Sequence, residues 1–403
     1  MHKKLSLLLP LVMFPILFLS ACQQTPQEVQ ERMEKYGDNS QIDKEIVKEF
    51  CTLDELKKIN VSDISDKYNV TVKNKIDFSQ IEGINILDLQ YESDCLKLRD
   101  KYAKLFDIDK NSIERRAADD EGEEYIYESE DKRAGKYFAL SENGFVSYID
   151  GISYECTEDD GIDVDTYATY DLGRDDVSGK TIDFDGVNVA FDDIMHHAAD
   201  FAQKHFSMQD ISFGVLDVYE RKVKKNGKIV PQLSLLMGLY YKGILLEPYV
   251  TEYEEHGSNK QYTHEKVTNF SAEFNYENRE KFSFAALQKK CRINSVKSVD
   301  KIITPECALK IVNKTFSGFG KIEASDFRAI YACFPVLESV DGYKDKNVSY
   351  KAGQKIEGRP VYAMWINKEN NGISDFGISI VPEHYIYVDM ISGEITTDYK
   401  IEQ

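Results

Sequence analysis

The residue types best suited to chemistry lie between Asp192 and Asp200, where two histidines stand among aspartates. Asp193 and His197 are four residues apart, as are His196 and Asp200, so in a helix each pair shares a face. A carboxylate that orients a histidine is what general-base and metal sites need. The stretch lacks the HExxH spacing and a third ligand, so a solvated helix face with ordinary ion pairs is the alternative that we favour. We therefore predict no catalytic or metal site, and these four residues are the candidates to check.

Two acidic segments could be mistaken for calcium sites. Asp107, Asp109 and Asn111 imitate the start of an EF-hand loop, but Ser112 replaces its glycine and Ala118 its bidentate glutamate. The second segment contains four aspartates, Asp159, Asp160, Asp163 and Asp165. Acidic loops are usually solvated, so we expect no calcium at either place. The chain has no GxSxG, P-loop or GxGxxG motif, and we predict no cofactor.

Aromatic residues recur in the apolar runs, notably Tyr240, Tyr241, Tyr362 and Trp365. An aromatic-lined groove would suit a peptide or a sugar. Packing in the core and across strands explains the same residues, and we favour that explanation.

Six cysteines follow Cys22: Cys51, Cys95, Cys156, Cys291, Cys307 and Cys333. They are widely spaced in a long chain, unlike the cysteines of small disulfide-rich domains. There is no CxxC pair and no cysteine-histidine cluster with zinc spacing. We expect most of them to be free, buried thiols.

The N-terminus indicates a secreted, lipid-anchored protein. A basic start, Met1 to Lys4, precedes an apolar run from Leu5 to Leu19 that two prolines interrupt. This run is shorter than the roughly 20 apolar residues of a membrane-spanning helix and has the layout of a signal peptide. Its end, Leu19-Ser20-Ala21-Cys22, resembles the lipobox of bacterial lipoproteins. That resemblance implies removal of residues 1–21 and lipid on Cys22, whose acyl chains would anchor the protein to the outer face of a membrane.

Composition narrows the choice of partners. The formal net charge is −20, and there is no basic stripe. Phosphate backbones repel such a chain, so nucleic acid is not an expected partner. The content of 25 tyrosines and 21 phenylalanines is ample for packed cores, which excludes a disordered stalk.

Hydrophobic periodicity divides the mature chain into four segments. Residues 22–40 are a polar tether, and 41–178 form an N-terminal α+β domain. In that domain we expect helices at about 41–59 and 93–106, strands at 68–72 and 84–89, and a hairpin at 137–149. Residues 179–300 and 301–403 are two further α+β units.

Those last two units look like a tandem repeat. A helix pattern at 192–206 precedes an alternating strand and a proline-led apolar strand, and a helix pattern at 304–316 precedes the same sequence of elements. Thr304 is the expected N-cap of the second helix, with Pro305 in its first turn. The predicted fold class is α+β, with antiparallel sheets that each have helices packed on one face.

The C-terminal segment carries a further resemblance. Tyr385 to Ile395 is similar to the closing strand-turn-strand of PepSY-type domains, which are small extracytoplasmic α+β modules. We expect Val388 to face a sheet, Ser392-Gly393 to turn, and Ile395 to re-enter. The whole layout also resembles uncharacterised lipoproteins of Gram-positive anaerobes, which supports fold and location and implies no activity.

Three functions follow from these patterns. The first is a non-catalytic envelope lipoprotein that binds or regulates a protein or peptide partner. The second is a solute-binding lipoprotein of a transporter, a class that usually has two lobes of alternating strands and helices. The third is a hydrolase without a recognisable motif. We favour the first, because the titratable residues are not gathered into a constellation that could carry out catalysis.

Overall fold

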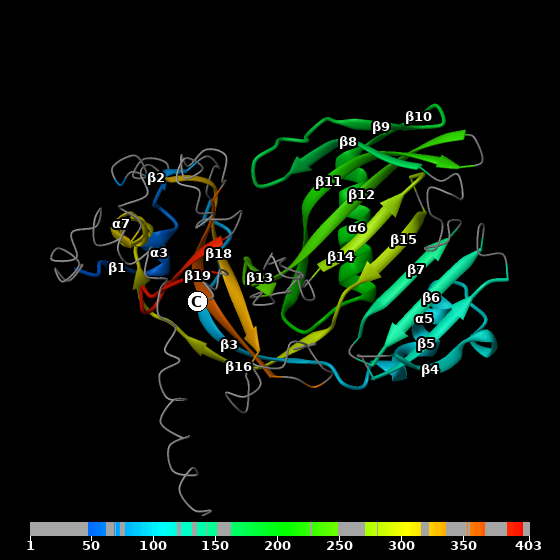
Figure 1. The fold of residues 1–403 in the computed structure, drawn as a ribbon, viewed down its shortest axis with the longest axis horizontal. Coiled ribbons are helices and arrows are strands. Elements are labelled where there is room, and N and C mark those ends of the chain that lie inside the picture. The colour runs from blue at the N-terminus through cyan, green and yellow to red at the C-terminus, as the bar shows by residue number, and fades with distance from the viewer. Residues whose placement is uncertain are drawn as a thin grey trace, which may run out of the picture.

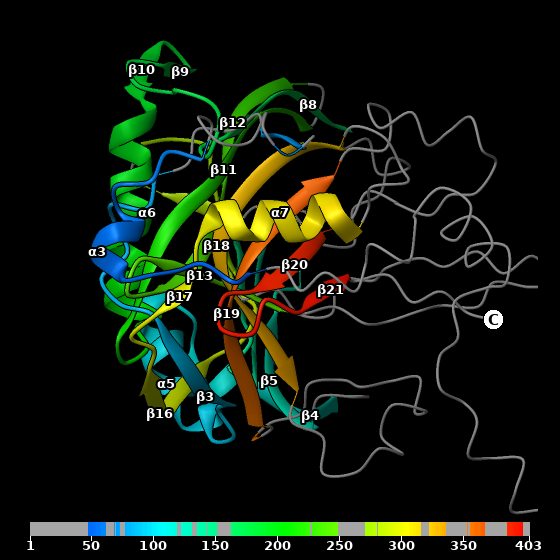
Figure 2. The ribbon, with the colours of Figure 1, turned by 90° about the vertical axis from the view of Figure 1, so that its left-hand side faces the viewer.

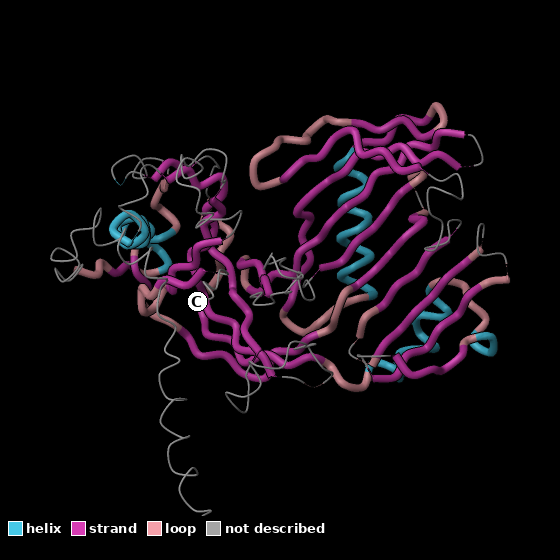
Figure 3. Tube along the Cα trace, viewed as in Figure 1, coloured by secondary structure: helices cyan, strands magenta, loops and turns pink. Residues whose placement is uncertain are grey.

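The computed structural model shows a protein that is mostly β, built around one large mixed sheet (Figure 1). It describes residues 47–61, 68, 70–72, 77–118, 122–130, 135–142, 144–150, 163–225, 228–248, 271–279, 281–315, 322–335, 353, 355–366 and 385–397. The predicted signal peptide, Cys22 and the predicted tether lie outside these residues. Strands clearly predominate in the trace (Figure 3).

The larger section of the sheet is wholly antiparallel. Its strands lie in the order β8 (Asp163–Asp171), β11 (Ile211–Lys225), β12 (Lys228–Tyr241), β14 (Ser271–Tyr276), β15 (Phe282–Leu287), β7 (Val146–Asp150), β6 (Lys136–Ser141), β5 (Gly122–Glu128) and β4 (Glu114–Ala118). The section thus combines three parts of the chain that are distant in sequence.

The smaller section is built around the antiparallel pair β18 (Ile322–Pro335) and β19 (Lys355–Ile366). The other edge of β18 pairs in parallel with β2 (Val70–Val72) and β13 (Ile244–Pro248). The other edge of β19 pairs with β20 (Tyr385–Asp389) and with β3 (Asn85–Tyr91). Strand β20 then pairs with β21 (Ile395–Thr397), and β3 with β16 (Cys291–Ser298). The short strand β13 also pairs with β12, so the two sections form one sheet.

The turn that joins β12 to β13 depends on its glycine. Lys242 and Gly243 both have positive φ, 49° and 78°, the conformation of a type I′ hairpin turn. A Cβ on Gly243 would lie 2.1 Å from the carbonyl oxygen of Gln80. Only glycine therefore allows the chain from 77–81 to approach the point where the two sections meet.

The principal helix is α6 (Phe191–His205), which packs on one face of the larger section (Figures 1 and 2). Its buried residues are Phe191, Ile194, Ala198 and Ala202, spaced as one helix face requires. Acidic residues in its first turn and basic residues in its last complement the helix dipole.

Smaller elements complete the described part. The other helical elements are α3 (Leu53–Leu56), α5 (Arg99–Leu105), α7 (Pro305–Thr315) and the 3-10 turns η2 (Cys95–Leu98) and η3 (Lys110–Ser112). Two further strand pairs are β1 (Phe50–Cys51) with β17 (Ile302–Ile303), and β9 (Thr181–Phe184) with β10 (Val187–Ala190). Thr304 Oγ1 accepts from the N–H of Cys307 at 3.1 Å, which confirms the predicted cap of α7.

The core beneath α6 is rich in aromatic rings. Phe206 stacks on Phe274 with centroids 6.0 Å apart, and Phe201 meets Phe274 edge to face at 5.7 Å. Tyr102 of α5 contacts the same group through Phe206 at 6.1 Å. This main core is continuous from Cys51 to Met390 and serves both sections.

The predicted fold class is wrong. We expected separate α+β units in tandem, each with its own sheet and helices, whereas the described chain is mostly β with one shared sheet. A helix does precede a long hairpin in both places, α6 before β11–β12 and α7 before β18–β19. The parallel pairing of β13 with β18 merges their strands, and such a long-range contact leaves no local pattern in sequence. The segment boundaries themselves stay predictions.

The other local predictions have mixed outcomes. The hairpin at 137–149, the strand at 84–89 and the helix at 93–106 are confirmed, the last as η2 followed by α5. The helix at 41–59 is wrong within the described residues, because Phe50 and Cys51 pair with β17 and only Leu53–Leu56 is α-helical. The C-terminal hairpin is confirmed, with Val388 opposite Ile395.

Candidate functional site

The four candidates on α6 lie on or near the exposed side of the helix. Among the described residues there is no cluster of three or more potential metal ligands. His197 Nδ1 lies 3.0 Å from Tyr276 Oη, which ties the helix to β14. Asp193 faces Arg279 across 4.0 Å in an exposed ion pair, while His196 and Asp200 are exposed. Exposed pairs of this kind contribute little to stability.

The acidic segments serve structural roles where the structure describes them. Asp109 Oδ1 accepts from the backbone N–H of Asn111 at 3.0 Å and begins η3. Asp107 has φ of 53° and lies beside Lys136, whose Nζ is 3.4 Å from its carboxylate. Asp159 and Asp160, and the side chains of Asp163 and Asp165, lie outside the described residues.

The aromatic candidates lie mainly in the core. Tyr362 is buried and donates to the carbonyl of Ile303 at 2.9 Å, and Tyr241 packs against Tyr331 at 6.1 Å. Tyr240 lies on the opposite face of the sheet from Tyr241. The side chain of Trp365 is not among those described. Core packing thus accounts for Tyr241 and Tyr362.

The cysteines give no activated thiol in the described part. Cys51, Cys95, Cys291, Cys307 and Cys333 are free and buried, which confirms the prediction of buried thiols for these five. Burial raises the pKa of Cys51 and Cys95 to about 11 and that of Cys291 to about 12. Thiols held in the neutral form are poor nucleophiles.

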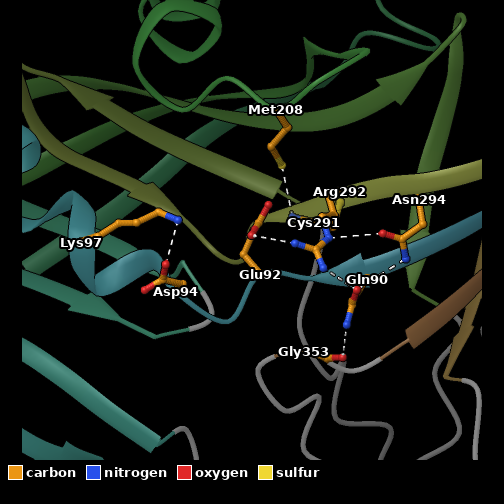
Figure 4. Close-up of polar contacts among 9 residues, drawn as sticks. All are labelled: Gln90, Glu92, Asp94, Lys97, Met208, Cys291, Arg292, Asn294 and Gly353. Carbon is orange, nitrogen blue, oxygen red and sulfur yellow. Dashed lines mark hydrogen bonds and ion pairs between the residues drawn. The ribbon is translucent and has the colours of Figure 1, made fainter.

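A polar network lies in the smaller section, where β3 pairs with β16 (Figure 4). Gln90 Oε1 accepts from Arg292 Nη2 at 2.7 Å, and Gln90 Nε2 donates to the carbonyl of Gly353 at 2.7 Å. Arg292 also approaches Glu92 at 3.9 Å and donates to Asn294 at 3.2 Å. These side chains satisfy one another near solvent, so the network fixes the strands and offers no free group for chemistry.

The adjoining lysine is a second possible centre. Lys290 is only 8% exposed, and burial lowers the pKa of its ammonium. A lysine of this kind can act as a nucleophile. Its Nζ, however, lies 3.4 Å from the carbonyl of Ser207, and no described acid or base completes a catalytic arrangement around it.

The best candidate lies on the face of the larger section that is opposite α6. Strand residues alternate between faces, and Val218, Leu235 and Phe274 face the core. Their polar neighbours are here called the polar rows: Asp217, Tyr219 and Arg221 on β11, Gln232 and Ser234 on β12, and Ser271, Glu273, Asn275 and Glu277 on or next to β14. The apolar Leu236 lies between Asp217 and Glu273. Gln232 and Ser234 are each 4% exposed, so polar groups are buried on a sheet face.

Part of this arrangement is internally satisfied. Ser234 Oγ donates to Gln232 Oε1 at 3.3 Å, and Gln232 Nε2 donates to Glu277 Oε1 at 3.3 Å. Tyr219 Oη donates to Asp217 Oδ2 at 3.3 Å. Burial, followed by the nearby Asp217, raises the pKa of Tyr219 to about 12. Such a network holds its members in fixed orientations.

Three other groups of this face lack hydrogen bonds. The Arg221 guanidinium lies 5.1 Å from the Tyr219 ring centroid, and its Nε is buried without a partner. Ser271 is 4% exposed, and its Oγ has no partner either. Glu273 has no hydrogen-bond partner among the described residues; burial raises its pKa, and the nearby Arg221 opposes that shift. Buried polar groups without partners are rare in folded proteins and call for an explanation.

The polar rows end where the two sections meet. Tyr240 packs against Gly214, where a Cβ would lie 2.9 Å from the ring. Burial raises the pKa of Tyr240 to about 12; the charge of Arg328 opposes this shift and that of Glu247 adds to it. These two form an ion pair at 3.6 Å. On this face the polar rows thus give way to a small apolar cluster, against which Tyr240 packs and which extends into the smaller section.

The sequence contained a signal for the polar rows that we missed. Residues 232–234 and 273–277 alternate polar with apolar side chains, and in 217–221 Glu220 interrupts the same pattern. Alternation shows that each strand has a polar face, but only the register shows that the three faces are adjacent.

Comparisons with known proteins add a distant structural likeness. No protein-family model matches the sequence, and no curated protein matches it. The fold is similar to that of an uncharacterised protein from Eubacterium rectale ATCC 33656, with a TM-score of 0.46 and 14% identity over 83% of this chain and 91% of that chain. Among the described residues no helix is long and apolar enough to cross a membrane. The lipobox and PepSY resemblances stay predictions.

Proposed function

We propose that this chain is a cell-envelope lipoprotein that binds a protein or peptide partner through its polar rows, without catalysis. The observation that carries the proposal is the group of unpartnered donors and acceptors at Arg221, Ser271 and Glu273. Burying such groups without hydrogen bonds costs free energy. A partner that supplies the missing hydrogen bonds would recover that cost on binding.

The arrangement of the scaffold supports a binding role. The polar rows stand on three strands, with β12 paired to β11 on one side and to β14 on the other, and the core under α6 fixes the other face of these strands. Side chains on such a rigid element lose little freedom when a partner binds, which favours affinity. A catalytic site would need a nucleophile or metal, a base and a charge-stabilising group together, and the described histidines of α6 lie on the opposite side of the sheet.

The anchor is tested with Cys22→Ala. We expect the wild type to partition with membranes and to carry a mass increase from lipid. The variant should lack that mass and either leave the membrane fraction or accumulate as precursor. Identical mass and fractionation of both proteins would remove the lipoprotein part of the proposal.

The binding role is tested by cross-linking in envelope preparations, with immobilised wild-type chain, an Arg221→Met/Glu273→Gln variant, and a control variant. Asp193→Asn/His196→Ala changes exposed residues on the other side of the sheet and serves as that control. We expect the wild type and the control to capture the same partner and the polar-row variant to lose it. Equal capture by all three, or hydrolytic activity that the polar-row variant loses, would refute the proposal.

A further inference from the structure

The three unpartnered groups differ in what they require from a ligand. Glu273 offers carboxylate oxygens and needs a donor, whereas Arg221 Nε needs an acceptor. Ser271 Oγ can both donate and accept. Ser271 and Glu273 are two residues apart on β14 and therefore on one face. Arg221 is close enough to Glu273 to influence its ionisation. One ligand could therefore meet Glu273 and Arg221 together, whereas Ser271, paired with Gly238, lies six residues along β12 from the partner of Arg221.

From this complementarity we infer that the partner is a peptide segment with a basic side chain, whose ammonium or guanidinium pairs with Glu273 while a neighbouring main-chain carbonyl accepts from Arg221. The inference rests on the proposed function and specifies its partner. A peptide group has a donor and an acceptor close together, as this pair of side chains requires. The Tyr219 ring lies under the Arg221 guanidinium and holds it beside the site.

Charge favours a cationic partner over an anionic one. The chain has a formal net charge of −20, and the polar rows hold three carboxylates and one guanidinium, Asp217, Glu273, Glu277 and Arg221. The field of such a surface attracts cationic ligands and speeds their association. An anion would have to approach Arg221 past the carboxylates.

The test uses the full-length chain in non-ionic detergent and a fluorescein-labelled peptide, blocked at both ends, with one central lysine among glycines and serines. Fluorescence anisotropy gives its Kd. A second peptide carries Nε-acetyl-lysine at the centre, which removes the charge and keeps the backbone. Free lysine, added as a competitor, reports whether the site takes an amino acid instead of a segment.

We expect the lysine peptide to bind about tenfold more tightly than its acetylated form, as expected for loss of one charge pair at a partly desolvated site. Glu273→Gln should weaken binding of the lysine peptide by about tenfold and leave the acetylated peptide unchanged. Arg221→Met should weaken both peptides. The control, Asp193→Asn, changes the net charge as Glu273→Gln does, on the exposed surface of α6, and should bind like the wild type.

Several outcomes would overturn the inference: no binding of the lysine peptide, equal affinity for both peptides, equal weakening by Glu273→Gln and Asp193→Asn, or full competition by free lysine. Circular dichroism and thermal unfolding of each variant confirm that it is folded. Capture of a partner through the polar rows together with no binding of the lysine peptide would refute this inference and leave the proposed function standing.

Discussion

The two faces of β11, β12 and β14 use alternate residues of the same strands for opposite purposes. Toward α6, Val218, Leu235 and Phe274 are buried among other apolar side chains. On the other face, the polar rows combine satisfied hydrogen bonds with three groups that lack partners. Apolar burial supplies most of the free energy of folding, so the first face stabilises the sheet. The second face can then keep incompletely paired groups available for a ligand.

A register shift would destroy this division. Because side chains alternate with a period of two, a slip of one residue moves the polar set into the core and the apolar set out of it. Folding therefore specifies the register strongly here, and substitutions on the two faces should have very different consequences.

The largest expected effect is on the α6 face. Phe274→Ala removes a ring that stacks on Phe206 and meets Phe201, and should lower the free energy of unfolding by about 3–5 kcal/mol. Urea denaturation measures the change. Asn275→Ala, the next residue and a member of the polar rows, is the control and should cost less than about 1 kcal/mol. Comparable losses for both would show that the two faces do not differ in this way.

A smaller loss is expected at Asp389, a polar residue that is structural. Burial would raise the pKa of Asp389, but hydrogen bonds from Arg359 and from the backbone N–H groups of Ser392 and Ile391 lower it overall. Asp389→Ala should cost about 1–3 kcal/mol at neutral pH. A carboxyl group whose pKa is lower in the folded state than in the unfolded state stabilises the fold at pH values above its unfolded pKa. This stabilisation is lost as the pH falls through the folded pKa. The deficit of the variant should therefore shrink in acid; a deficit independent of pH would contradict the ion pair.

Glu273→Gln should change the free energy of unfolding in the opposite direction and raise it. The folded pKa of Glu273 is raised, so ionising it costs stability as the pH rises from its ordinary value of 4.5 through the folded value. The glutamine variant removes that cost and should be more stable than the wild type at neutral pH, by at most about 1 kcal/mol. Thermal unfolding at several pH values checks this, and the difference should disappear below the ordinary carboxyl pKa. A destabilised variant at neutral pH would mean that Glu273 has a stabilising partner.

The smallest effect is expected on the exposed surface of α6. Replacing Asp193, His196, His197 and Asp200 with alanine removes one long ion pair and the bond to Tyr276, and should leave partner capture unchanged. The cross-linking assay measures it on protein shown to be folded by circular dichroism. Loss of capture by this variant would move the functional site from the polar rows to the helix.

The sequence was informative where structure is local. Helix α6 and the β6–β7 hairpin follow from apolar spacing and turn residues, because short-range patterns specify both. Phe50 and Cys51 were misassigned to a helix because pairing with Ile302 and Ile303 overrides local propensity. The site escaped prediction for the same reason: Arg221 and Glu273 share a sheet face only because β11 and β14 both pair with β12, and no local pattern specifies that pairing.

The pairing of the first strands with the last ones has a consequence for how the chain must fold. Strand β1 pairs with β17, β2 with β18, and β3 with both β16 and β19, so these N-terminal strands find their partners 200 or more positions later. Contacts of such high sequence separation form slowly. The N-terminal strands remain without their partners until residues beyond 290 are available, and the fold cannot close before then. The smaller section therefore forms only after most of the chain has been synthesised, whereas all strands of the larger section find their partners within residues 114–287.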